Sequence, residues 1–149
     1  MRLQAIPIDV ITRESFLRYG EPVELHRPDP GRAQRGEDDY RTLGRLASTG
    51  WRVSVHCVRA RSTDVLNAFD SRRLLTPQTG TALLCVAPPE RPEAIEIFVL
   101  DRSVLLAPAV PHALVALTLE ALVQVSENFN IESRAHPLRR AITAAGVWV

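Results

Sequence analysis

The chain has few cysteines: only Cys57 and Cys85 occur among its 149 residues. Both lie inside apolar runs, where a free thiol is usually a buried and inert side chain. Two isolated cysteines build neither a disulfide framework nor a cysteine cluster for zinc. We therefore expect two reduced thiols in the core.

Neither sign of charge dominates, because charged residues make up 23% of the chain and the formal net charge is +1. Without a basic block, the sequence predicts no nucleic-acid partner. Every apolar run is interrupted well before the roughly 20 residues that a membrane-spanning helix needs. The N-terminal residues include Gln4, Pro7 and Asp9 where a signal peptide has an apolar segment. We expect a cytoplasmic protein without membrane contacts.

The sequence also lacks internal repeats, a glycine-rich phosphate loop and a serine nucleophile elbow. A chain of 149 residues fits one domain, which at this size buries about two-thirds of its unfolded surface. We predict a single domain over residues 1–149, with no cofactor.

Short apolar runs with the alternating pattern of β-strands are the main feature that the sequence does contain. Turn signals such as Pro88-Pro89 and Asp101-Arg102 separate them. No interval between residues 40 and 128 has room for a crossover helix, so we expect antiparallel strands in a sandwich or small barrel. The predicted strands are residues 3–8, 21–26, 40–47, 51–60, 81–87, 94–100, 103–107 and 113–125.

Two helical segments are predicted outside this β region. Thr12 is a candidate N-cap for a short helix over residues 13–19, which Gly20 would end. Residues 136–145 are predicted to form a helical tail, with Gly146 as its stop.

Residues 27–39 carry two prolines, two glycines and seven charged residues without apolar periodicity. We expect a surface loop that is either a functional lid or rim, or disordered. The apolar end of the chain and the long strands predict a homodimer, formed by sheet extension or by packing of the tail.

A single imidazole, His112, lies within the apolar stretch 95–125, directly after a Pro-Ala-Val-Pro turn signal. Near neutral pH such a ring can act as an acid, a base or a hydrogen-bond donor in a barrel mouth. The alternative is a histidine bonded to a backbone carbonyl. With His56 and Glu96 it offers suitable chemistry for a divalent metal. Because nothing in the spacing requires these three residues to converge, no metal site is predicted.

Several arginines lie in neighbouring segments, and a guanidinium fork suits a carboxylate ligand. Arg59 shares the strand face of Val53, Val55 and Cys57, which makes it a candidate for the pocket, together with Arg72. The alternative for both arginines, as for Arg61 and Arg73, is a solvated rim.

Glu120 interrupts the apolar run 113–125. It is either an acidic group that faces the barrel and binds substrate, or an edge charge that prevents strand-to-strand aggregation.

Four short segments resemble the ureidoglycolate lyase family, a set of small cupin barrels, in order and spacing over about 120 residues. They are Thr12-Arg-Glu-Ser-Phe16 followed by Tyr19-Gly20, Leu74-Leu-Thr-Pro77 with Gly80, Pro111-His112-Ala113-Leu114, and Asn128-Phe-Asn-Ile-Glu132. The resemblance implies an all-β, cupin-like double-stranded β-helix barrel with its site in the barrel mouth. It also implies release of urea from ureidoglycolate to give glyoxylate, with His112 as the catalytic acid or base and an arginine on the carboxylate.

Other positions depart from the family pattern. Where the family carries Glu-Arg-His and then Gln, this chain has Leu66-Asn-Ala-Phe-Asp70 and Arg72-Arg73. Before His112, apolar residues replace the family's polar ones. Two classes of function therefore stay open: a ureidoglycolate-lyase-like enzyme, and a cupin without this chemistry that binds or senses a small carboxylate or acts as a structural partner.

Overall fold

A computed structural model of the chain describes residues 2–23, 51–128 and 130–148. These residues form thirteen β-strands and no helix, and so no helix in these ranges could span a membrane. The predicted all-β class is confirmed, whereas the predicted loop 27–39 and strand 40–47 lie outside the described residues. The strands are β1 Leu3–Gln4, β2 Ile8–Val10, β3 Gly20–Pro22, β4 Trp51–Val58, β5 Ser62–Phe69, β6 Arg73–Thr79, β7 Ala82–Val86, β8 Glu96–Val99, β9 Val104–Leu106, β10 His112–Ala116, β11 Ala121–Asn128, β12 Ser133–Thr143 and β13 Gly146–Trp148.

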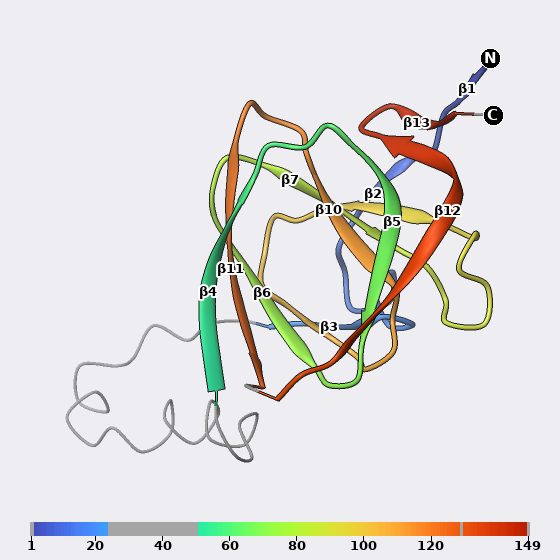
Figure 1. Cartoon of the computed structure of the whole chain (residues 1–149). Coiled ribbons are helices and arrows are strands. Elements are labelled where there is room, and N and C mark those ends of the chain that lie inside the picture. Colours follow the sequence, from blue (N-terminus) through green and yellow to red (C-terminus); the bar gives the residue numbers. More distant parts are fainter. Residues whose placement is uncertain (1, 24–50, 129, 149) are drawn as a thin grey trace.

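The strands form two sheets that face each other (Figure 1). One sheet has eight strands in the order β1-β13-β12-β5-β10-β7-β8-β2, and the other has five in the order β3-β9-β6-β11-β4. The described pairings are antiparallel, as predicted, except that β2 runs parallel to β8. The β4–β5 and β10–β11 connections pass from one sheet to the other, so these four strands border the same side of the space between the sheets.

The main core fills the space between the sheets. Phe16, Tyr19 and Phe98 are fully buried there, with ring centroids 5.4–5.9 Å apart. Strand β7 is buried on both faces: Leu84 belongs to this core, and Leu83 belongs to a second apolar cluster on the other face of the eight-stranded sheet. Each fully buried leucine of this kind stabilises the fold by about 1.5–3 kcal/mol.

The predicted C-terminal helix over residues 136–145 is wrong, because most of this segment belongs to β12. Strand β12 pairs with β5 over most of its length. Between Pro137 and Ile142, β12 advances by five residues while its partner β5 advances by only two, and this mismatch marks a bulge. Pro137 has no N–H to donate to a sheet, and prolines within sheets are found at bulges and edges. The edge of β5 supplies backbone hydrogen bonds that local helix propensity cannot outweigh.

The predicted N-terminal helix over residues 13–19 is also wrong, because the segment forms a run of turns. Thr12 and Ser15 exchange backbone-to-hydroxyl hydrogen bonds of 2.9 and 3.0 Å, so Thr12 does cap the segment. The N–H of Phe16 donates to the Thr12 carbonyl and that of Gly20 to the Phe16 carbonyl, without a continuous helical ladder between them. Seven residues are too few to sustain a helix by propensity alone.

Strand β4 points its apolar face outward. Val53 and Val55 are 56% and 53% exposed, and Cys57 is exposed, whereas Cys85 is buried. The expectation of two buried thiols is therefore wrong for Cys57. Exposed valines on an edge strand are the kind of surface that sheet extension would use, and the homodimer stays a prediction.

The predicted strand 113–125 is two strands in different sheets, β10 and β11, joined by a turn that packs against Gly80. Gly80 has φ +66°, and a Cβ atom added to it would lie 2.0 Å from the Glu120 carbonyl oxygen. Only a residue without a side chain fits this close approach between turns.

We expect Gly80→Ala to lower the free energy of unfolding by about 1–3 kcal/mol, because the added methyl group clashes with backbone and the left-handed torsion strains alanine. Urea denaturation measures the change. Ala109→Gly is the matched control, since Ala109 already adopts φ 67° and glycine relaxes that torsion. Equal stability of the Gly80→Ala variant and the wild type would contradict the close approach.

Candidate functional site

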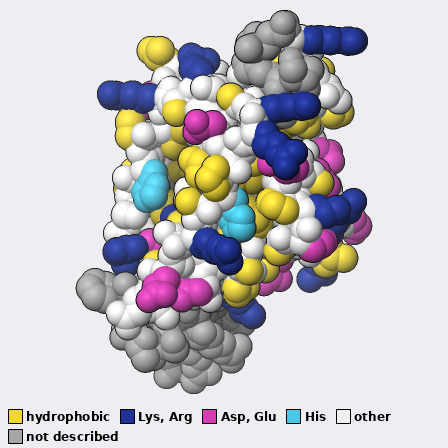
Figure 2. Space-filling model, turned by 45° about the vertical axis from the view of Figure 1, so that its right-hand side comes forward, with side chains coloured by type: hydrophobic (Ala, Val, Ile, Leu, Met, Phe, Trp, Pro, Cys, Tyr) yellow, Lys and Arg dark blue, Asp and Glu magenta, His cyan; other side chains and the backbone are white. Residues whose placement is uncertain are grey.

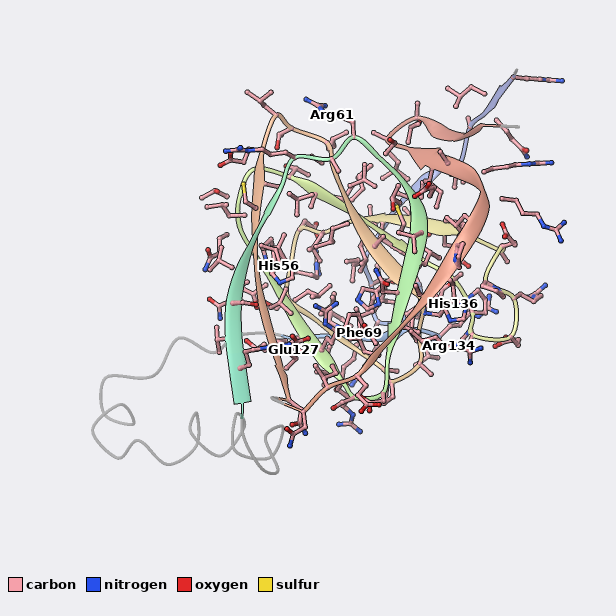
Figure 3. All side chains as sticks on the ribbon, in the orientation of Figure 1. His56, Arg61, Phe69, Glu127, Arg134 and His136 are labelled. Carbon is pink, nitrogen blue, oxygen red and sulfur yellow. The ribbon has the colours of Figure 1, made fainter. Side chains whose placement is uncertain are left out.

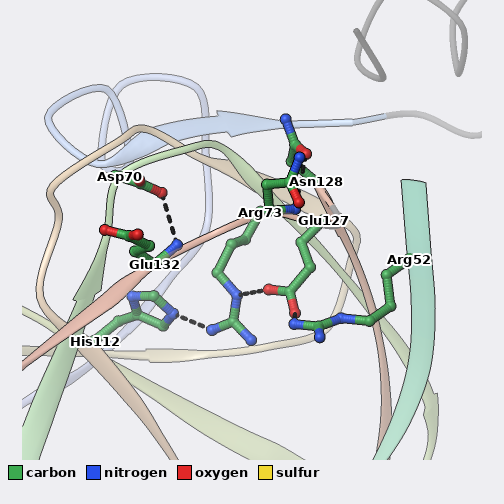
Figure 4. Close-up of polar contacts among 8 residues, drawn as sticks. Arg52, Asp70, Arg73, His112, Glu127, Asn128 and Glu132 are labelled. Atoms are coloured by element: carbon green, nitrogen blue, oxygen red, sulfur yellow. Dashed lines mark hydrogen bonds and ion pairs between the residues drawn. The ribbon is translucent and has the colours of Figure 1, made fainter. Parts of the chain in front are cut away.

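A buried guanidinium lies at the start of β6. Arg73 is 8% exposed, its Nε donates to Glu127 Oε2 at 2.7 Å, and its Nη1 lies 2.7 Å from His112 Nε2 (Figure 4). The Phe69 ring centroid is 3.9 Å from the guanidinium carbon, which is favourable cation–π geometry. Residues from β11, β10 and β5 thus hold the Arg73 side chain in one orientation.

Glu127 lies between two arginines because of strand register. It is directly opposite Arg73 on β6 and Arg52 on β4, and its other oxygen accepts a 2.5 Å hydrogen bond from Arg52 Nη2. Burial raises the pKa of Glu127, but the hydrogen bonds and charges of Arg52 and Arg73 together outweigh burial and hold the pKa below its ordinary value. The carboxylate is therefore ionised, and the three side chains carry one net positive charge.

Both ring nitrogens of His112 are hydrogen bonded. Nδ1 lies 2.9 Å from the carbonyl oxygen of Val110, an acceptor, so the proton is assigned to Nδ1. Nε2 then accepts from Arg73 Nη1. Burial, reinforced by the charge of Arg73, lowers the pKa of His112 to about 4. At neutral pH the ring is uncharged and orients the guanidinium of Arg73.

A cavity of about 510 Å³ opens beside this cluster, between β4 and β5. Arg73 and His112 line it from one end, and His56 extends toward it from β4 (Figure 3). Burial, followed by the charge of Arg73, holds the pKa of His56 below 6.5, so the ring is mostly neutral at pH 7. The remaining lining combines two polar side chains, Thr63 and Asn67, with mainly apolar ones, among them Val58, Val65, Phe69, Leu75, Leu114 and Val125.

A second cavity of about 440 Å³ lies away from this cluster, bordered by β12 and the N-terminal segment. Its charged lining residues, Glu93, Arg139 and Arg140, are all exposed. On the face shown in Figure 2, arginine and acidic side chains are interspersed, so that face carries no continuous basic surface. The first cavity, in contrast, is lined by the buried side chains of Arg73 and His112, which makes it the better candidate for a ligand site.

No family model matches the chain, and no curated protein matches its sequence. The assignment of a site therefore depends on the geometry of the chain itself.

Among the arginines considered from the sequence, Arg73 is the one that is hydrogen bonded to His112. Arg59 borders the cavity, but its side chain is 74% exposed and bonded to Glu120 at 2.8 Å. Arg72 is exposed. It directly precedes the inward-facing Arg73, so its side chain points to the opposite face. The predicted face of β4 that carries Arg59 points outward.

Arg73 was expected either in the pocket or on a solvated rim, and neither Arg52 nor Glu127 was among the candidates predicted from the sequence. The usable signal was alternation: Val123 and Val125 point inward from β11, so Glu127 does too. Among the described residues, no group of three His, Cys, Asp or Glu side chains is placed to hold a metal ion. Glu96, which was considered as a metal ligand with His56 and His112, instead forms an ion pair with Arg18, with 3.7 Å between its Oε1 and Arg18 Nη1.

The low pKa of His112 makes stability depend on pH. Because the folded value of about 4 lies below the ordinary 6.5, the stabilising effect of the neutral ring is complete above pH 6.5 and is lost as the pH falls toward 4. We expect a loss of up to about 3 kcal/mol over this range, measured by urea denaturation at a series of pH values.

His112→Gln should flatten this dependence, since the amide does not titrate. His136→Gln on the exposed strand β12 is the control and should keep the wild-type slope. An unchanged slope in His112→Gln would show that other groups cause the loss.

Proposed function

We propose that the protein binds a small carboxylate in the cavity between its two sheets, on the guanidinium of Arg73. The observation that carries this proposal is a buried, oriented arginine that lines a cavity of about 510 Å³. Ligand pockets typically have volumes of about 300–1,000 Å³ and combine apolar walls with a few placed polar groups.

Arg73 keeps donors for a ligand. Its Nε and Nη1 are engaged, and none of the hydrogen bonds described within residues 2–23, 51–128 and 130–148 uses Nη2. The same cavity presents His56, Thr63 and Asn67 as further polar groups. A carboxylate on Nη2 would form a charge-assisted hydrogen bond with an arginine that is already held in place.

The rest of the ligand faces aliphatic and aromatic side chains, so a short hydrocarbon body suits the cavity better than a second charged group. We propose a cupin-like barrel as the architecture, because small barrels of this type hold one ligand inside. The two facing sheets and the interior cavity support it.

Binding, not ureidoglycolate cleavage, is the activity that we favour. A general acid or base must reach the substrate with a free ring nitrogen, and those of His112 are bonded to Val110 and Arg73. The ring therefore suits a positioning role, in which it fixes the arginine that holds the carboxylate.

Isothermal titration calorimetry with butyrate tests the binding proposal. We expect saturable binding to the wild-type protein and at least a tenfold loss of affinity in Arg73→Gln, because the charge-assisted contact is removed. Arg134→Gln, on exposed β12, is the matched control and should bind as the wild type does. Equal affinity in all three proteins would contradict a site on Arg73.

Incubation with ureidoglycolate tests the lyase alternative. We expect glyoxylate to form no faster than without protein, because His112 has no free nitrogen for proton transfer. Turnover by the wild type that disappears in His112→Gln would overturn this expectation and assign catalysis to the ring.

A further inference from the structure

The charged groups around the cavity leave one positive charge. Arg52 and Arg73 share Glu127, and Arg59 pairs with Glu120. Three arginines and two glutamates in this set give a net charge of +1. His56 and His112 contribute no charge at neutral pH, since both are mainly unprotonated.

The two glutamates differ in how strongly they act on the cavity. The side chain of Glu127 is 4% exposed, and that of Glu120 is 42% exposed. A charge in the interior acts through a low effective dielectric, whereas solvent and salt screen an exposed one. Glu127 is therefore the carboxylate that sets the potential at Arg73.

We propose that Glu127 is a specificity-determining residue that restricts the cavity to singly charged anions. This inference rests on the proposed carboxylate binding. With Glu127 ionised, one ligand carboxylate neutralises the cluster, and a second would be an uncompensated negative charge beside mainly apolar walls. A charge without a partner in such surroundings is unfavourable. Monocarboxylates are thus accepted and dicarboxylates of similar size are rejected.

A purely structural role for Glu127 makes a different prediction. If the carboxylate only held the two arginines in place, its removal would weaken the binding of every anion. If it sets the charge, its removal favours dianions specifically, and removal of Arg52 in the same protein restores the original preference. The half-exposed side chain of Arg52, 48% accessible, permits this second substitution.

Calorimetric titration with butyrate and succinate at pH 7.5 and low ionic strength distinguishes these roles. We expect the wild type to bind butyrate at least tenfold more tightly than succinate. In Glu127→Gln the formal charge rises to +2, and succinate should gain at least tenfold relative to butyrate. The double variant Glu127→Gln/Arg52→Gln returns to +1 and should regain the wild-type preference. Glu120→Gln, at the exposed pair, should change the ratio less than about twofold because of screening.

Arg52→Gln alone keeps the test available if Glu127→Gln does not fold, which thermal unfolding of each variant shows. Its net charge is zero, so it should bind butyrate about tenfold more weakly and strengthen the discrimination against succinate. If the wild type binds butyrate but none of the folded variants alters the butyrate-to-succinate ratio, the role of Glu127 is overturned and carboxylate binding stands. If neither anion binds the wild type, the proposed function itself fails.

Discussion

The interior of this protein depends on keeping the guanidinium of Arg73 charged and paired although the side chain is largely buried. Transfer of an unpaired charge into a protein interior costs several kcal/mol, so each partner of Arg73 constrains the strand from which it comes. Glu127 must face inward from β11, His112 from β10 and Phe69 from β5. A one-residue slip of any of these strands would turn its partner to the other face of the sheet. The arginine thereby couples the registers of both sheets at one end of the core.

The same constraint prepares the cavity for a ligand. Glu127 and His112 bind the guanidinium from opposite sides, and Phe69 lies across its face, so the side chain is immobilised before any ligand arrives (Figure 4). A preorganised donor loses little conformational entropy on binding. His112 contributes as a neutral acceptor, because a protonated ring would repel Arg73 and lose its hydrogen bond. The alternative in which this histidine bonds a backbone carbonyl matches the contact with Val110.

Alternation in the sequence predicted the β class and the central strands β7, β8 and β9, whose buried residues are almost all apolar. It did not predict β5 and β6, where Asp64, Asn67 and Pro77 interrupt the apolar pattern. Residues 136–145 were predicted to be helical, because nothing in this segment of the sequence shows that β5 pairs with it. Cross-strand pairing is a tertiary contact, so neither it nor the convergence of Arg52, Arg73 and Glu127 can be read from one segment.

Strand β4 shows why the site was harder to find than the fold. Hydrophobicity alone would bury Val53 and Val55, yet both valines face solvent, and the face of β4 that borders the cavity carries His56, which is itself exposed. Full burial of each valine would stabilise the fold by about 1.5–3 kcal/mol. The observed orientation of β4 is therefore less stabilising than one in which Val53 and Val55 faced the core. Places where a strand departs from the pattern that favours folding are those at which function is expected. The reversed face of β4 therefore supports a ligand site between the sheets, since it places Arg52 on the buried Glu127 and His56 in the lining of the cavity.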